Sequence, residues 1–530
     1  MTGHLAIVLH THLPFVRHPE HARSLEERWL HEAILECYLP LLGVLERLEN
    51  DRVPVAFTMS LTPPLLAMWS DPLLKERFEG HLARLRSLAA REEKRLWGNA
   101  EFAPIAHFYA NRLAELEERW RRIGGDLAGA FRRHWDEGRI ELIGCSATHA
   151  YLPGLLPTFS GLAAQLEIGL AAFERTMGRP PQGMWLPECA FHPAFDHELG
   201  KRGVRYTLVD THGLTRAQPP VVAAPHRPAV SPSGCVFFAR DPEASQAVWS
   251  RDAGYPGDPF YRDFYRDIGF DLPESELEGE TGPYGVRISS GLKYHRITGP
   301  TGDKAPYQPG VALERAWFHA NDFLQKRTES LGRSAKAMQS PPVCVAPYDA
   351  ELFGHWWFEG PDFLEALFRQ LPKYPIQAVT LGQHLREGGL VEAAMPEASS
   401  WGEGGYGNVW VGPETAWFWR HIHHATRDVE TLVRSQPERR GVHGDALDQA
   451  IVELLLLQSS DWPFIVKTNT TVQYAEARFR AHHHRLSHLL HLAQKETWEP
   501  ADDAFLADVR NRDNFLGEMP SHRLRAAFTA

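Results

Sequence analysis

Two acidic residues of this 530-residue sequence follow short apolar runs. Glu188 follows the run 183–186, and Asp349 follows the run 343–346 within the aromatic-rich stretch PYDAELFGHWW. Carboxyl groups at the ends of buried strands are partly removed from water, so we expect at least one of the two pKa values to be raised. Two carboxyl groups in unlike environments can cleave a glycosidic bond, one attacking the anomeric carbon and the other protonating the leaving oxygen. On spacing alone, the alternative is two unrelated buried acids that are paired with bases.

Other ionisable residues follow the remaining apolar runs. The carboxyl ends of parallel strands meet at one edge of a barrel or open sheet, so these side chains are expected to converge there. They are His10, His12, His149, Asp210, His212, Arg240 and Glu351.

The spacing of His10 and His12 also raises the possibility of a metal site. Two neutral imidazoles can bind Zn²⁺, as in a metal-dependent deacetylase. A third ligand is needed, and no strand-end Asp-Asp pair or HxxxH motif lies nearby, so we expect no metal and no other cofactor. The runs 421–424 (HIHH) and 482–484 (HHH) fall on predicted helices, where consecutive side chains point in different directions. We interpret both as solvated faces.

Several of the 16 tryptophans lie in loops rich in Gly and Asp, such as SSWGEGGYGNVW. Flat rings in such loops suit stacking on sugar rings. Trp249 and Trp401 are the main candidates, and for Trp410 core packing is equally plausible. A non-catalytic glucan-binding protein would also carry such rings, but it would have no need of both Glu188 and Asp349.

The elements that must position these residues form an alternating pattern. Helical patterns at 26–48, 74–88, 106–135 and 159–176 lie between apolar runs, which favours an α/β fold with a parallel sheet. Seven or eight strands predict a barrel, intact or incomplete, with a doubly wound sheet as the fallback. The predicted strands are 5–9, 53–59, 140–143, 183–186, 204–209, 235–239, 343–346 and 376–380.

The pattern changes near residue 390. We predict a catalytic domain over 1–390 with insertions around 190–302, and a helical domain over 391–530 whose entry loop faces the barrel. Helical patterns at 414–435, 445–458 and 472–494 support the second domain. The Pro-rich stretch 218–234 is predicted to be a loop, and 241–302 an elaborated loop or small subdomain.

Composition excludes several classes of partner. The formal charge of −11 argues against nucleic acid and anionic membranes as main partners. No run of about 18 apolar residues and no signal-like N-terminus is found, and the five cysteines form no CxxC motif. We therefore expect a soluble, cytoplasmic, monomeric enzyme.

Five ordered segments resemble glycoside hydrolase family 57, and most closely its 1,4-α-glucan branching enzymes. They span most of the chain, and the fourth is the most specific. The segments are HTHLP (10–14), SATH (146–149), WLPE (185–188), PYDAELFGHWW (347–357) and SDWPF (460–464).

This resemblance implies an incomplete seven-stranded (β/α) barrel, a helical C-terminal domain that completes the substrate cleft, and a retaining mechanism without metal. The predicted eighth strand, 376–380, is then extra or misassigned. Glu188 would be the nucleophile and Asp349 the general acid and base. An α-glucan polysaccharide would be the partner. The matching substrate-contacting positions are His10, His12, His149, Arg240, Trp249, Gly257, Trp401 and Asp461.

One segment departs from the family pattern. Branching enzymes of the family usually carry a tyrosine on a loop after the fifth strand, where it shields the intermediate from water, but 211–231 contains no Tyr. Thr470 also stands where relatives often have a substrate-contacting Gln. These differences keep α-glucan hydrolysis, or 4-α-glucanotransferase activity with little branching, open as alternatives.

Overall fold

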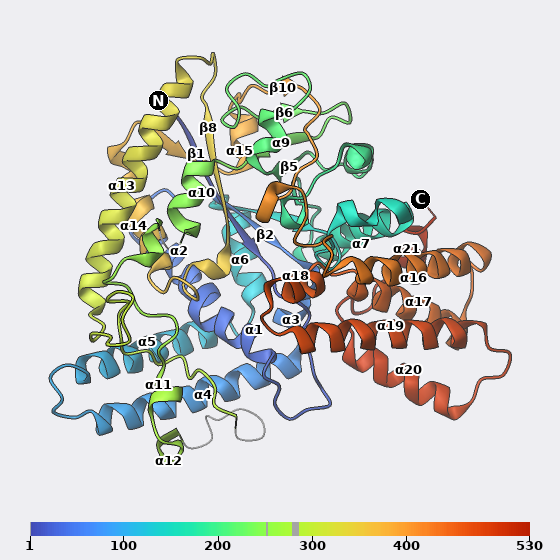
Figure 1. Ribbon diagram of the computed structural model, residues 1–530, viewed down its shortest axis with the longest axis horizontal. Coiled ribbons are helices and arrows are strands. Elements are labelled where there is room, and N and C mark those ends of the chain that lie inside the picture. The colour runs from blue at the N-terminus through green and yellow to red at the C-terminus, as the bar shows by residue number, and fades with distance from the viewer. Residues whose placement is uncertain (1, 251–252, 278–285, 530) are drawn as a thin grey trace.

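The computed structural model describes residues 2–250, 253–277 and 286–529, and a ring of parallel strands forms its centre (Figure 1). One sheet has the order β4-β3-β2-β1-β8, and a second sheet pairs β5 with β7. Single parallel bridges join the two, Gly183 to Tyr206 and Arg240 to Val345. The ring strands are β1 (Gly3–Thr11), β2 (Phe57–Leu61), β3 (Ile140–Cys145), β4 (Met184–Trp185), β5 (Tyr206–Val209), β7 (Val236–Ala239) and β8 (Val343–Asp349).

These strands confirm the predicted incomplete (β/α)7 barrel. The barrel is incomplete because a single bridge joins the two sheets beside β4 and another single bridge joins them beside β7. All nine residues of β1 are buried, as expected of a parallel strand that is covered on both faces. The eighth predicted strand exists as β9 (Ile376–Ala378), but it pairs only with the first residues of β1 and stands outside the ring.

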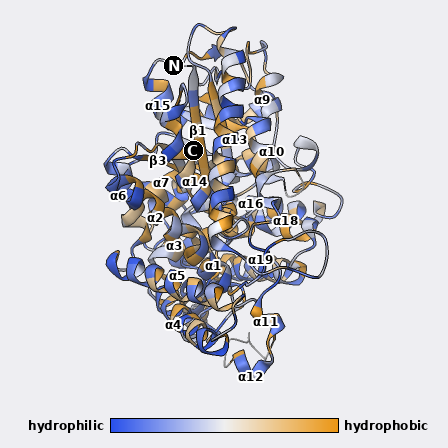
Figure 2. Cartoon of the chain, turned by 90° about the vertical axis from the view of Figure 1, so that its left-hand side faces the viewer, coloured by the Kyte–Doolittle hydropathy of each residue, from blue (hydrophilic) through white to orange (hydrophobic). Residues whose placement is uncertain are grey.

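Helices surround the ring, with hydrophobic colour on the central strands and mixed colour on the outer helices (Figure 2). The predicted helix 106–135 is in fact two helices. The helix is interrupted at Gly124 and Gly125, which both have a positive φ. The helices of this part are α1 (Glu27–Ala33), α2 (Leu39–Asn50), α3 (Pro63–Ser70), α4 (Pro72–Arg95), α5 (Ala103–Arg122), α6 (Leu127–Asp136), α7 (Phe159–Met177), α13 (Pro309–Ala335), α14 (Gly360–Gln370) and α15 (Leu381–Arg386).

The connection from residue 190 to 302 is elaborate, as expected. Its Pro-rich part is mostly loop, and short strands β6 (Ala229–Val230) and β10 (Glu392–Ala393) pair there. The connection carries short helices before and after β7, and 251–252 and 278–285 lie outside the described residues. The short helices are α8 (Asp196–Lys201), α9 (Thr211–Thr215), α10 (Pro242–Trp249), α11 (Ile268–Asp271) and α12 (Glu274–Leu277).

The C-terminal part is helical, as expected, and packs beside the barrel (Figure 1). Its central helix α17 is rich in apolar residues in its second half and is buried along most of its length, as expected of a helix surrounded by others. The helices are α16 (Ala416–Ser435), α17 (Gly441–Leu457), α18 (Asp461–Thr468), α19 (Val472–Gln494), α20 (Pro500–Arg512) and α21 (Ser521–Ala526).

Within the described residues, one helical stretch, 152–177, is long and apolar enough to cross a membrane. In this structure 67% of its apolar window is buried inside the protein. We interpret it as a core helix.

Candidate active site

The backbone at Glu188 adopts a conformation that is rare for a residue with a side chain. Its φ is 64°, in the left-handed region, and Cys189 follows at 48°. Such positions cost about 1–3 kcal/mol each and cluster at functional sites. The strained turn is held from outside, because the backbone N–H of Trp401 donates to the Glu188 carbonyl at 2.8 Å and Phe191 pairs with Ser399.

Each oxygen of the Glu188 carboxyl group accepts a hydrogen bond. The Trp401 indole Nε1–H donates to Oε2 at 2.7 Å, and the Ser460 hydroxyl donates to Oε1 at 2.8 Å. Burial raises the pKa of Glu188 to about 7, while these two donors act in the opposite direction. The side chain is therefore desolvated but is equipped to exist as a carboxylate, which is what a nucleophile requires.

Asp349 ends β8 directly beside β1, where it is the register neighbour of His10. Burial raises the pKa of Asp349 well above its usual range, and repulsion from the Glu351 and Glu188 carboxylates adds to the effect. Its surroundings thus favour the protonated form of Asp349. Of the two groups, Asp349 suits the general acid and Glu188 the nucleophile.

The three strand-end histidines form one stacked group. The His10 ring stacks on Trp185 with centroids 4.4 Å apart, and the rings of His12 and His149 stack at 3.9 Å. His10 Nε2 lies 2.9 Å from His149 Nε2. Burial lowers the pKa of His10 and His149 well below the usual range, so both are neutral and can exchange hydrogen bonds with hydroxyl groups.

The helical domain contributes directly to this group. Asp461, at the start of α18, lies 3.0 Å from His12 Nε2. Ser460 contacts His149 Nδ1 at 2.9 Å in addition to Glu188. The predicted reach of Asp461 into the barrel is therefore present in the structure.

The remaining predicted residues lie at differing positions around the site. Arg240 forms an ion pair with Asp210 at 2.6 Å, beside the Glu188 turn. Trp249 is 38% exposed and its ring meets that of Trp401 edge to face at 5.8 Å. Gly257 lies in the short 3-10 turn Tyr255–Gly257.

Trp410 is buried, with 1% of its surface exposed, and stacks on Tyr151 at 5.2 Å. Of the two roles left open for Trp410, core packing fits its position and sugar stacking does not. Because its indole is enclosed by its own loop, Trp410 supports that loop from beneath.

The segment 211–231 lacks tyrosine, but Tyr406 of the Trp401 loop lies against its first helix, α9. The Arg216 guanidinium donates to the Tyr406 hydroxyl, and the Tyr406 ring meets His212 edge to face at 4.9 Å. His212 Nε2 also bonds the Gly405 carbonyl at 2.7 Å. Half of Tyr406 is exposed, so a tyrosine ring does stand beside α9.

Ser460 was not among the candidate site residues predicted from sequence, and Glu351 was expected at the strand ends without a role in binding or catalysis. Ser460 stands within the SDWPF segment, and Glu351 stands two residues after Asp349. Their motifs gave a signal for each, but the hydrogen bond from Ser460 to Glu188 and the one from Tyr38 to Glu351 depend on pairing across the fold.

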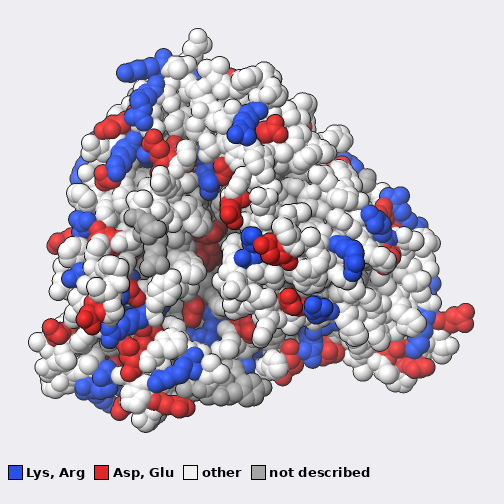
Figure 3. Space-filling view, viewed as in Figure 1, with Lys and Arg blue, Asp and Glu red and all other residues white. Residues whose placement is uncertain are grey.

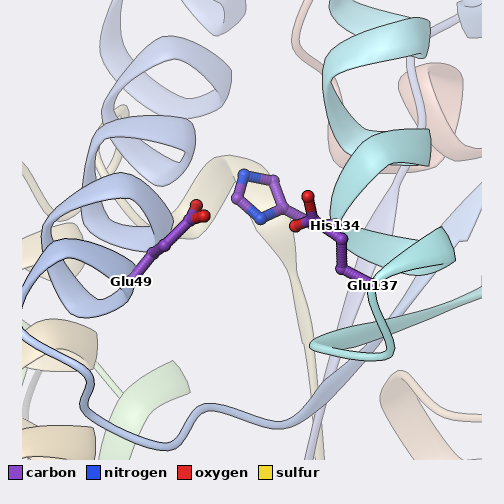
Figure 4. Close-up of side chains that lie close together, drawn as sticks. All are labelled: Glu49, His134 and Glu137. Carbon is purple, nitrogen blue, oxygen red and sulfur yellow. The ribbon is translucent and has the colours of Figure 1, made fainter.

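Two His-acid clusters lie away from these strand ends among the described residues. Figure 4 shows the first, formed by Glu49, His134 and Glu137. Arg139 approaches Glu49 at 2.6 Å and Glu137 at 2.5 Å. Guanidinium groups already supply the cations here, so we interpret the cluster as an ion-pair network.

The second cluster corrects an expectation. His482 was predicted to lie on a solvated helix face, but it is fully buried. Its Nδ1 bonds Glu453 at 2.8 Å, and Arg478 bonds its Nε2 at 3.0 Å. Burial is possible because these charged partners, together with Asp513, replace water.

The face in Figure 3 carries both signs of charge interspersed, and it is hollowed near its centre, where acidic side chains line the wall. No broad basic area is seen on that face. Its polar hollow is compatible with an uncharged, hydroxyl-rich ligand.

Family models match both parts of the chain. The model described as Glycosyl hydrolase family 57 matches residues 6–281, and the model described as 1,4-alpha-glucan branching enzyme, C-terminal, matches residues 421–522. A 1,4-alpha-glucan branching enzyme of Thermococcus kodakarensis is 32% identical over 97% of this chain and 77% of its own length.

Solved structures are similar over nearly the whole chain. The alpha-amylase AmyC of Thermotoga maritima is 36% identical with a TM-score of 0.92, covering 99% of both chains. A GH57-type branching enzyme of Pyrococcus horikoshii is 32% identical with a TM-score of 0.88, covering 99% of this chain and 97% of its own.

Proposed function

The chain belongs to glycosyl hydrolase family 57, and we propose that it is a retaining 1,4-α-glucan branching enzyme. The observation that carries the proposal is the unlike setting of the two carboxyl groups. Glu188 accepts hydrogen bonds from Trp401 and Ser460, while burial and neighbouring carboxylates raise the pKa of Asp349 well above its usual range. Similarity to two proteins described as branching enzymes adds support.

The reaction is a double displacement. Asp349 donates its proton to the oxygen of an α-1,4 bond as the Glu188 carboxylate attacks the anomeric carbon, and the freed chain leaves. Asp349, now ionised, then removes the proton from a 6-hydroxyl of another glucan. That oxygen displaces Glu188 and forms an α-1,6 branch.

Transfer succeeds only if the acceptor hydroxyl reaches the intermediate before water does. Trp249 and Trp401 lie edge to face near the Glu188 turn, and their indole faces suit stacking against glucose units. Ser460 and Asp461 complete the other side of the site from the helical domain. Such an enclosed site binds an acceptor chain and limits the access of water.

Hydrolysis of α-glucan is the second candidate, favoured by the missing tyrosine in 211–231 and by the similarity to a protein described as an alpha-amylase. Incubation of the purified protein with amylose, followed by debranching and chain-length analysis beside a reducing-end assay, separates the two. We expect new α-1,6 branches with few reducing ends. Reducing ends without branches would establish hydrolysis, and unchanged amylose would refute both.

We propose further that the protein acts in the cytoplasm, as a monomer without metal, on a glycogen-like glucan. Size-exclusion chromatography with light scattering tests the monomeric state, and metal analysis of the active enzyme tests the absence of metal. Stoichiometric zinc would instead favour the deacetylase alternative.

A further inference from the structure

The helix that runs from Glu27 to Asn50 contains one wider turn. Residues Ile34–Tyr38 form a π-helical turn, in which the Leu39 N–H donates to the carbonyl of Ile34, five residues earlier. Pro40 follows at once and has no N–H to give to an earlier carbonyl. Single π-turns inside α-helices occur often at functional sites.

Three consecutive residues of this turn bind the loop that carries Asp349. The Tyr38 hydroxyl donates to Glu351 Oε1 at 2.5 Å, and the Cys37 thiol donates to the Ala350 carbonyl at 2.9 Å. Glu36 Oε2 lies 2.7 Å from His355 Nδ1. These three contacts hold the loop over residues 350–355, directly after Asp349.

The backbones of the turn and the loop are also in direct contact. Gly354 has a φ of +116°, and a Cβ placed there would lie 1.7 Å from the Glu36 carbonyl oxygen. No other amino acid fits this position without displacing one of the two segments. Asp349 is thus presented by a loop that rests on the π-turn.

Glu351 is the partner through which the turn reaches Asp349. Burial raises the pKa of Glu351 to about 7, and the Tyr38 hydrogen bond opposes this effect by favouring the carboxylate. Among the neighbouring charges, the Glu351 carboxylate has the largest effect on the pKa of Asp349. Burial keeps the Tyr38 hydroxyl protonated, so it remains a donor.

We propose that Tyr38 and Glu351, held by the π-turn Ile34–Tyr38, are positioning residues for the proton on Asp349. This rests on the proposed role of Asp349 as the general acid. The hydroxyl of Tyr38 favours the carboxylate form of Glu351, and that nearby negative charge favours the protonated form of Asp349. The other titratable groups that face the pair are Glu188, His12, His355, Cys37 and Cys189.

The chain offers a matched control pair. The Tyr307 hydroxyl donates to Glu359 Oε1 at 2.7 Å, both side chains are buried, and the pKa of Glu359 is also raised to about 7 by burial. This Tyr–Glu pair lies near the far end of the same loop, and the causes of the Asp349 pKa shift do not include it.

The first experiment records the turnover of amylose against pH for Tyr38→Phe and Glu351→Gln, with Tyr307→Phe and Glu359→Gln as controls. Activity is lost at high pH when Asp349 loses its proton. We expect both test variants to move this alkaline limb down by about 1 pH unit, since a nearby negative charge is removed or weakened. The control variants should leave the limb in place. An unmoved limb in the test variants, or equal movement in the controls, would overturn the proposal.

A second experiment needs no substrate. Unfolding by denaturant is followed against pH for wild type, Asp349→Asn, Glu351→Gln and the double variant. Comparison of wild type with Asp349→Asn gives the pH at which ionisation of Asp349 destabilises the fold. The same comparison in the Glu351→Gln background should give a value about 1 pH unit lower. Equal values in the two backgrounds would refute the coupling. If amylose is not turned over, the proposed function fails while this cycle still decides the inference.

Discussion

Replacing Glu188 with Gln should stabilise the fold at neutral pH while abolishing glycosyl transfer. The Glu188 side chain is buried, and burial raises its pKa from 4.5 to about 7. Since the folded-state pKa exceeds the unfolded value, the stability linked to this group is complete below about pH 4.5 and is lost as the pH rises through about 7. At about 1.4 kcal/mol for each pH unit, this loss amounts to about 3 kcal/mol.

Denaturant unfolding of wild type and Glu188→Gln from about pH 5 to about pH 8 measures the effect. The free energy of unfolding of wild type should fall relative to the variant by about 3 kcal/mol across this range. Glu359 also has a raised pKa, but the causes of its shift do not include Glu188, so its contribution is the same in both proteins and cancels. Gln keeps a carbonyl oxygen for the Trp401 indole, so packing is little changed.

Glu438→Gln is the control, because the Glu438 side chain is 88% exposed. Its pH profile should follow that of wild type. Parallel profiles for Glu188→Gln and wild type would refute the argument that burial of the nucleophile is costly. Loss of stability in Glu188→Gln at every pH would indicate that the side chain serves packing instead.

Three further changes test the surroundings of the site. Trp401→Phe removes the indole N–H that the nucleophile accepts, worth about 1.5–3 kcal/mol, so turnover should fall and its acidic limb should move to higher pH in a rate profile. Gly354→Ala places a Cβ against the Glu36 carbonyl and should lower the thermal midpoint of unfolding. Gly388→Ala is the control, because Gly388 also has a positive φ (+86°) but has open space around the added Cβ, so its midpoint should fall much less. Tyr406→Ala should raise the number of reducing ends per branch formed on amylose, since removing the ring admits water. An unchanged ratio would refute a role for Tyr406 in excluding water.

Much of the barrel could be predicted because its signals are local. Each ring strand is a short apolar run, and the polar residue that ends the run marks the catalytic edge. Glu188 and Asp349 were identified in this way. The eighth strand had the same local signal, and only its pairing with the start of β1 places it outside the ring.

The contacts that tune the carboxyl groups could not be predicted by local pattern. Trp401 and Ser460 are 213 and 272 residues away from Glu188 in sequence. Only the folded barrel and helical domain bring them to the same carboxylate. The prediction that His482 lies on a solvated helix face was wrong for the same reason. Its partner Glu453 lies on another helix and allows His482 to be buried.

The helical domain is therefore a part of the catalytic site as well as its cover. The barrel positions Ser460, because the Ser460 backbone N–H donates to the His149 carbonyl at 3.0 Å. The Ser460 hydroxyl in turn donates to Glu188. The buried Gln165 and Gln458 side chains bond each other at 2.9 Å beneath this junction. Without the helical domain and its entry loop (391–530) Glu188 would lose both of its donors, Trp401 and Ser460, and its carboxylate would be less favoured. The boundary near residue 390 separates the elements of the barrel from those of the helical domain, but residues from both sides of it form the one active site.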